Sequence, residues 1–135
     1  MFGAIKDSHP SEMDRIIESA REKGVEIRDG NGERMAYSPG LSKGEPGQLF
    51  VSDNDSIGAW LHEEQHMIDD YDAGFMGFEG IMDIENRSRM EYNAYKKEID
   101  LALANGRKDI AEQLKELCRN EIESFGGIWD ESRLR

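Results

Sequence analysis

The stretch His62-Glu63-Glu64-Gln65-His66 places two histidines four residues apart, with a glutamate directly after the first. On a helix with about 3.6 residues per turn, positions i and i+4 share one face, so both imidazoles can bind one ion. This is the HExxH pattern of zinc hydrolases, in which histidines fill two of four tetrahedral positions. Glu63 lies about 100° round the helix, where it reaches a metal-bound water, and the pattern predicts it as the general base.

The histidine content bears on whether this match arises by chance, as HExxH does in many proteins without a metal site. The chain has three histidines, and two of them lie in the motif. The third, His9, precedes Pro10 and is not expected to bind metal. Two of three histidines at this spacing in a helical segment favour a metal site over coincidence.

A third protein ligand is needed, because a catalytic zinc site has three protein ligands and one open position. We predict Glu91 as this ligand, since it shares the inward stripe of the next predicted helix with Ala94, a small residue that lets two helices approach closely. The competing interpretation of Glu91 is a solvated acid on a charged helix. Glu98, two turns later on the same face, is the alternative ligand, or it orients a neighbouring group.

Acidic and aromatic residues near the motif are further candidates. Asp69 and Asp70 end the motif helix, where the helix dipole disfavours negative charge by about 0.3–1 kcal/mol. A hydrogen bond to a ligand histidine, or the electric field of the metal, would compensate this unfavourable charge. The alternative is that both acids are exposed to solvent at a fraying helix end. Tyr92 and Tyr95 lie near the predicted third ligand, where a hydroxyl could stabilise an oxyanion, although aromatic residues at this spacing are more often core.

The first half of the chain predicts a helix followed by a small sheet. Residues 11–23 carry apolar side chains at helical spacing. Residues 25–28 and 35–37 alternate in polarity around a turn sequence and predict a β-hairpin. Residues 38–47 predict a loop. The strand expected at residues 49–51 leads into the motif helix, and at a sheet edge it could bind a substrate backbone by strand addition.

The second half predicts three helices. The core-facing side of the motif helix is expected to carry Ile57, Trp60, Leu61, Ile68 and Tyr71. Residues 72–87 contain three glycines without an apolar period, and this length of connection indicates a functional loop over the site. A helix over residues 88–104 and a last amphipathic helix between Ile110 and Phe125 complete the chain.

Length and composition limit the classes of function. The 135 residues predict a single domain spanning 1–135, and no apolar run approaches the about 20 residues that span a bilayer. The first thirty residues lack a signal peptide, so the chain is expected to be soluble. The net charge of −12 disfavours nucleic acid and anionic membranes as partners and favours basic proteins, or simply solubility. Cys118, the only cysteine, is expected in the core.

Three segments together resemble a known family. They are the motif with its continuation Met67-Ile68-Asp69-Asp70, the preceding Gly44-Glu45-Pro46-Gly47 with its short strand, and Glu91-Tyr92-Asn93-Ala94-Tyr95. This combination resembles the zincin-like metallopeptidase toxin domains of bacterial polymorphic toxin systems, over roughly residues 25–104. HExxH and a later glutamate followed by alanine at +3 are also shared with many small gluzincin-type proteases.

The resemblance implies a minimal zincin fold of the α+β class: a small, mostly antiparallel sheet, an active-site helix and C-terminal helices. It implies His62, His66 and Glu91 as zinc ligands and Glu63 as the catalytic acid and base. It also implies a secreted or delivered effector domain, the C-terminal part of a longer protein, with a cognate immunity protein as partner. One departure is Tyr95, because thermolysin-like gluzincins have at that place an aspartate that supports the first histidine.

The sequence therefore predicts a zinc metalloendopeptidase in which a zinc-activated water, with Glu63 as general base, hydrolyses peptide bonds of a protein or peptide substrate. The effector domain of a secreted bacterial toxin is the favoured setting. One alternative is a small regulatory gluzincin that cuts an intracellular partner. The other is a non-catalytic metal-binding module, which the absence of a cysteine cluster disfavours.

Overall fold

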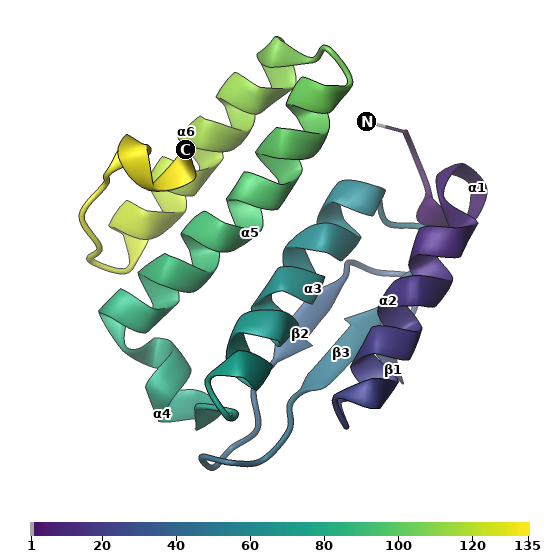
Figure 1. Ribbon diagram of the computed structural model, residues 1–135, viewed down its shortest axis with the longest axis vertical. Coiled ribbons are helices and arrows are strands. Elements are labelled where there is room, and N and C mark those ends of the chain that lie inside the picture. Colours follow the sequence, from purple (N-terminus) through teal and green to yellow (C-terminus); the bar gives the residue numbers. More distant parts are fainter. Residues whose placement is uncertain (1) are drawn as a thin grey trace.

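The computed structural model describes residues 2–135, and the chain has the predicted α+β class (Figure 1). Within these residues it forms six α-helices, three strands and one 3-10 helix. In chain order they are α1 (Ile5–Ser8), α2 (Pro10–Glu22), β1 (Glu26–Asp29), β2 (Ala36–Ser38), β3 (Gln48–Val51), α3 (Ile57–Asp72), α4 (Gly77–Met82), α5 (Ile84–Ala104), α6 (Lys108–Ser124) and η1 (Glu131–Leu134). The helices predicted at residues 11–23 and in the motif are confirmed.

The sheet is mixed, and its strand order is β1-β3-β2. Strand β1 pairs with β3 in parallel, and β2 pairs with β3 antiparallel, with Tyr37 opposite Leu49. The predicted hairpin between β1 and β2 is therefore wrong, as is the expectation of a mostly antiparallel sheet. The reason is burial: Leu49 is fully buried, whereas β1 and β2 are largely exposed, so the most apolar strand takes the central position. The edge strand next to the site is β2.

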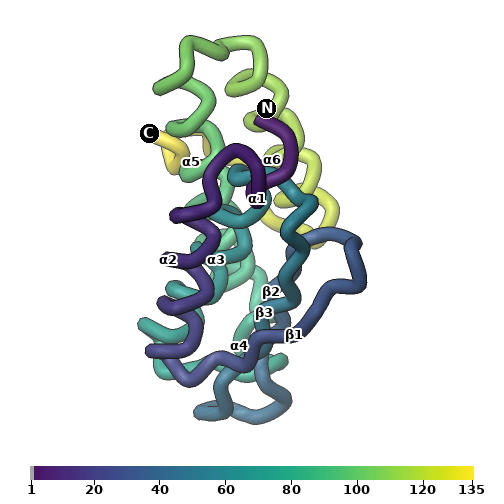
Figure 2. The backbone as a smooth tube through the Cα atoms, turned by 90° about the vertical axis from the view of Figure 1, so that its right-hand side faces the viewer, coloured from purple at the N-terminus to yellow at the C-terminus, as the bar shows by residue number. Residues whose placement is uncertain are grey.

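Helix α3 is the centre of the molecule. Figure 1 shows it between α5 and α2, and Figure 2 shows α2 and α3 covering one face of the sheet. The Ser56 hydroxyl caps the helix by accepting a hydrogen bond from the Ala59 N–H at 3.2 Å. This capping fixes where α3 begins and hence how its later turns face α5.

The buried stripe of α3 differs from the predicted one. Ile57, Trp60 and Met67 lie in the core as buried side chains, but Tyr71 is exposed. Glu64 shares the buried stripe, because the Arg15 guanidinium on α2 donates to both its oxygens at 2.8 and 2.9 Å. The ion pair compensates the burial of the Glu64 carboxylate. The spacing of apolar residues alone does not predict a buried acid at this position.

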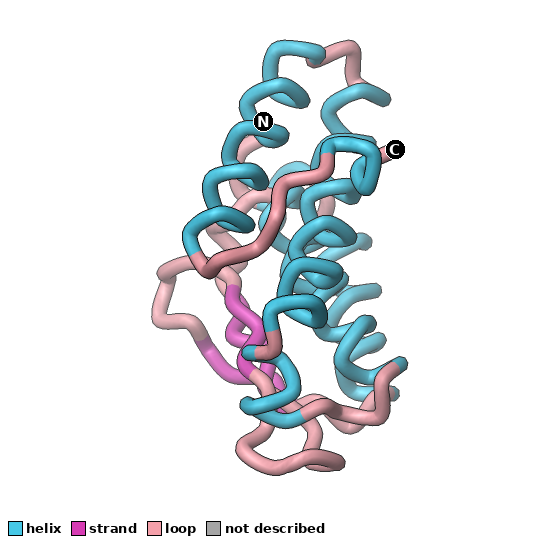
Figure 3. Tube along the Cα trace, turned by 90° about the vertical axis from the view of Figure 1, so that its left-hand side faces the viewer, coloured by secondary structure: helices cyan, strands magenta, loops and turns pink. Residues whose placement is uncertain are grey.

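The connection at residues 72–87 is more ordered than the sequence predicts. It contains helix α4, and α5 already begins at Ile84, where the Asp83 carboxylate accepts from the Asn86 N–H at 3.1 Å. Gly77 is required by packing, since its φ is +74° and a Cβ there would lie 2.7 Å from the backbone N of Lys43. Gly77 thus allows the start of α4 to lie against the loop after β2, a loop that Figure 3 draws in pink.

A second core cluster joins α5, α6 and η1. Its buried members are Tyr92, Tyr95, Ile99, Ala102, Ala111, Cys118, Ile122 and Leu134. The prediction that Cys118 is a core residue is confirmed. Among the described residues, no helix is both long and apolar enough to cross a membrane.

Candidate metal centre

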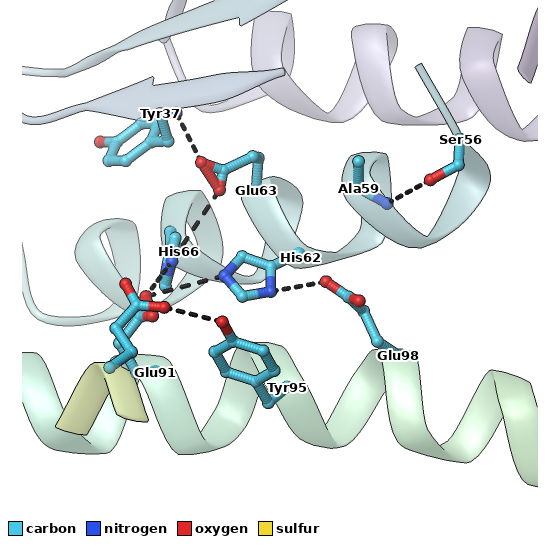
Figure 4. Close-up of polar contacts among 10 residues, drawn as sticks. Tyr37, Ser56, Ala59, His62, Glu63, His66, Glu91, Tyr95 and Glu98 are labelled. Atoms are coloured by element: carbon cyan, nitrogen blue, oxygen red, sulfur yellow. Dashed lines mark hydrogen bonds and ion pairs between the residues drawn. The ribbon is translucent and has the colours of Figure 1, made fainter. Parts of the chain in front are cut away.

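The packing of α3 against α5 brings the three predicted ligands together (Figure 4). His62 and His66 lie one turn apart on α3, with ring centroids separated by 4.8 Å. Across from them, Oε1 of Glu91 on α5 lies 2.6 Å from Nε2 of His66 and 3.7 Å from Nε2 of His62. Ala94, fully buried one turn after Glu91, occupies little space between the helices, in line with the sequence argument.

Glu63 lies on the sheet side of the two imidazoles. Its Oε2 is 3.9 Å from Nε2 of His66, and its Oε1 accepts a hydrogen bond from the Tyr37 backbone N–H at 3.2 Å. Potential ligand atoms of His62, Glu63 and His66 all lie within 4.8 Å of one another and form a candidate metal-binding group. Burial raises the pKa of Glu63 above its ordinary value, which outweighs the lowering by the histidines and is the direction suited to a general base.

The carboxylates around His62 favour positive charge at this place. Burial disfavours charged His62, but hydrogen bonds to Glu91 and Glu98 outweigh burial and raise its pKa to about 10. Burial also disfavours charged Glu91, but hydrogen bonds from both histidines hold its pKa well below the usual range. Positive charge on His62 is thus favoured by the carboxylates around it, and a divalent cation would supply positive charge in place of that proton.

The donor set fits zinc. Two imidazole nitrogens and one carboxylate oxygen are ligands that catalytic zinc sites use. Oε2 of Glu91 and Nδ1 of His66 are buried, and neither has a hydrogen-bond partner among the described residues. An unpaired buried carboxylate oxygen is costly unless a cation lies nearby, so the chemistry of the pocket agrees with a metal held by these side chains.

Glu98 contacts the first histidine rather than the position where the ligands converge. Its Oε1 lies 2.7 Å from Nδ1 of His62, on the ring edge away from Glu91 (Figure 4). Of the two roles that the sequence left open for Glu98, the geometry favours orientation of a neighbouring ligand. Glu98 lies about one helical turn after Tyr95 on α5.

The compensation expected for Asp69 and Asp70 comes from other groups. Asp69 accepts hydrogen bonds from the side-chain amides of Gln65 and Asn93, at 2.9 and 3.1 Å. Asp70 is fully buried and accepts from the Tyr37 hydroxyl and the Met76 N–H, at 2.5 and 2.8 Å. Among the described residues neither carboxylate bonds to a ligand histidine, because Asp69 faces α5 whereas Asp70 faces β2 and the residue before α4. The alternative of exposure is wrong for Asp70.

The two tyrosines lie in different places. The Tyr95 hydroxyl donates to Oε2 of Glu121 at 2.7 Å, and its ring meets the His62 ring edge to face. Tyr92 is core, stacked on Trp129, and its hydroxyl bonds to the C-terminal segment. Glu121, on α6, was not foreseen. Its contact with Tyr95 depends on the packing of α6 against α5, and its sequence surroundings are those of an exposed helix face.

Cavities adjoin Glu63 on both sides. The first, about 250 Å³, also contacts Tyr37, His66 and Glu91. The second, about 370 Å³, contacts His62 and Glu98. Glu63 therefore lines both cavities.

Replacing Glu98 with alanine should lower zinc affinity by about 10- to 100-fold, the usual effect of losing a carboxylate that orients a ligand histidine. His62 would keep its place on α3 but lose the contact to Nδ1 that fixes its ring. Competition with a fluorescent zinc chelator measures the affinity. Asp100→Ala is the control, since Asp100 lies on the same helix and pairs only with Lys96 in the solvent. Equal affinities of the Glu98 variant and the unmodified protein would contradict the orienting role.

Comparison with models of known protein families, with curated proteins and with solved structures gives no match to this chain. The resemblance to zincin-like toxin domains therefore stands on the residues that carry it. Of that resemblance, the structure supports the candidate group His62, Glu63 and His66 on one helix.

Proposed function

We propose that the protein is a zinc-dependent metallopeptidase. The observation that carries the proposal is the convergence of His62, His66 and Glu91 beside Glu63, in a group open to cavities on both sides. Structural zinc sites close all four positions, usually with cysteine. Here the only cysteine, Cys118, is buried in the core between α5 and α6.

The chain's own residues would divide the work as follows. His62, His66 and Glu91 would hold the zinc, with Glu98 orienting His62. Bound zinc supplies Lewis acidity, which lowers the pKa of a water and polarises a carbonyl. Glu63 accepts the proton of the water that attacks the peptide carbonyl and then donates it to the departing amine. The Tyr37 N–H holds the Glu63 carboxylate toward the cavity while this exchange takes place.

Strand β2 is suited to hold an extended substrate. The role suggested for residues 49–51 does not apply to β3, which is central, whereas β2 is an edge strand beside the site. Tyr37 on β2 contacts Glu63 and lines the first cavity. A peptide added along β2 would pass the predicted base and would share the Tyr37 N–H with the Glu63 carboxylate, with its alternate side chains pointing into the cavities.

Zinc content and cleavage together test the proposal. We expect about one zinc per chain by elemental analysis, cleavage of denatured protein substrates detected by mass spectrometry, loss of cleavage on chelation, and its return with added zinc. A zinc-loaded protein that cleaves nothing would favour the non-catalytic metal-binding module. Cleavage that persists without metal would contradict the mechanism.

We propose further that the domain is the effector of a secreted bacterial toxin, restrained by an immunity protein. This rests on the resemblance of the motif segments, and the net charge of −12 favours a basic partner. The active form, expressed in bacteria, should stop growth in the compartment that holds the substrate, either cytoplasm or periplasm. Full viability in both compartments, at protein levels equal to those of an inactive variant, would favour the regulatory peptidase.

A further inference from the structure

The cavity on the His66 side of Glu63 has an apolar wall and one fixed cation. The wall is formed by Pro39 after β2, Met82 at the end of α4 and Met90 on α5. Among the lining residues, all within the described chain, Arg87 is the one arginine or lysine. The cavity thus offers apolar contact surface and a single arginine, alongside the acidic residues Glu63, Glu91 and Glu121, to whatever extends past Glu63.

Arg87 is held without the use of its side-chain donors. Its guanidinium carbon lies 4.2 Å from the centre of the Phe125 ring, at the end of α6. Most other arginines pair with carboxylates. These are Arg15, Arg21, Arg28, Arg107, Arg119 and Arg133. Within residues 2–135, no carboxylate lies at ion-pair distance from Arg87, although the chain has 29 acidic residues and only 17 lysines and arginines.

The carboxylates that line the same cavity have other partners. Glu121 lines the same cavity, but its carboxylate accepts the hydrogen bond of the Tyr95 hydroxyl. A guanidinium stacked on an aromatic ring keeps its N–H fork free, and this fork matches a carboxylate through two parallel hydrogen bonds. The stacking on Phe125 also restricts the side chain before a ligand arrives, which lowers the entropic cost of binding.

Resting on the peptidase function proposed above, we propose that Arg87 is a specificity-determining residue that binds a carboxylate of the substrate residue beside the scissile bond. Two sources can supply this group. One is the side chain of an aspartate or glutamate within the substrate, and the other is the α-carboxylate at a substrate's C-terminus. The apolar wall of Met82 and Met90 would contact the methylene groups that carry the carboxylate.

Two matched peptide libraries test the proposal and separate the sources. Both are N-acetylated with randomised positions, and they differ only in a free or amidated C-terminus. Preference for acidic residues in both libraries identifies the side chain, whereas preference for the free terminus identifies the α-carboxylate. For the preferred peptide, Arg87→Gln should lower kcat/KM by about 10- to 100-fold, mainly through KM, as expected for a lost charge-assisted hydrogen bond. The isosteric peptide without the carboxylate should be cleaved equally by both proteins.

Two variants and a binding measurement keep the test independent of folding and turnover. Arg89→Gln is the control, since Arg89 lies on the same helix and contacts Asn86 outside the cavity; Arg87→Lys should restore only part of the preference. If no peptide is cleaved, the peptidase proposal fails. Calorimetric titration then tests whether Arg87 binds a carboxylate. It uses three acetylated pentapeptides: an amidated one containing glutamate, an amidated one containing glutamine, and a glutamine pentapeptide with a free C-terminus. The Arg87 proposal would be overturned if all three pentapeptides bound equally, or if the Arg89 variant lost as much affinity as the Arg87 variant.

Discussion

Glu63→Gln will lower kcat/KM for peptide hydrolysis by about 10²- to 10⁴-fold while zinc remains bound, because the substitution removes proton transfer and leaves the ligands in place. Glu63 is not among the three predicted ligands. Its Oε1 accepts from the Tyr37 N–H, a contact that the glutamine oxygen preserves. The loss should appear in kcat, because an amide cannot accept the proton of the attacking water. Steady-state kinetics and elemental analysis of the same preparation measure both quantities.

The matched control for this variant is Glu64→Gln. Glu64 is the next residue on α3, but its carboxylate faces α2 and pairs with Arg15. The control should lose stability and retain kcat when assayed well below its unfolding temperature. A Glu63 variant with unchanged kcat would place the base elsewhere. A Glu63 variant without zinc would instead show that this carboxylate binds the metal.

The part of the site that local geometry dictates was predictable from sequence. His62 and His66 share a face of α3 because a helix has a fixed period, and no tertiary contact is needed to establish this. Glu91 required a further step, the absence of another donor, together with the small Ala94. The structure places Glu91 against both histidines, because α5 packs along α3 at this point.

What the sequence could not reveal depends on long-range packing. The order of the strands follows from burial of Leu49 between two neighbours, and residues 25–37 alone fit a hairpin equally well. Asp70 finds its partner on β2, which is joined to it only through the fold. Arg87 and Glu121 meet the site from α5 and α6, and their positions in sequence are those of ordinary charged helix residues.

The identity of the third ligand decides between two sites, one centred on Glu91 and one centred on Glu98. If Glu91 binds the metal, Glu91→Ala will weaken zinc binding by more than the about 100-fold limit expected for an orienting residue, and so by more than Glu98→Ala. The reason is geometric, since Oε1 of Glu91 faces Nε2 of both histidines, whereas Glu98 faces Nδ1 of His62. Chelator competition on both variants gives the ranking directly.

Thermal unfolding supplies an independent measure of the Glu91 variant. At a zinc concentration about 1,000 times the dissociation constant of the unmodified protein, zinc should stabilise that protein by about 4 kcal/mol, or roughly 8–16 °C. At the same zinc concentration, a site that binds zinc 100-fold more weakly stabilises the folded protein by only about 1.4 kcal/mol. Circular dichroism without zinc shows whether the variant is folded. Two outcomes would assign the third ligand to Glu98 or to another side chain. In the first, zinc raises the unfolding temperature of Glu91→Ala as much as that of the unmodified protein. In the second, zinc raises the unfolding temperature of Glu98→Ala less than that of Glu91→Ala.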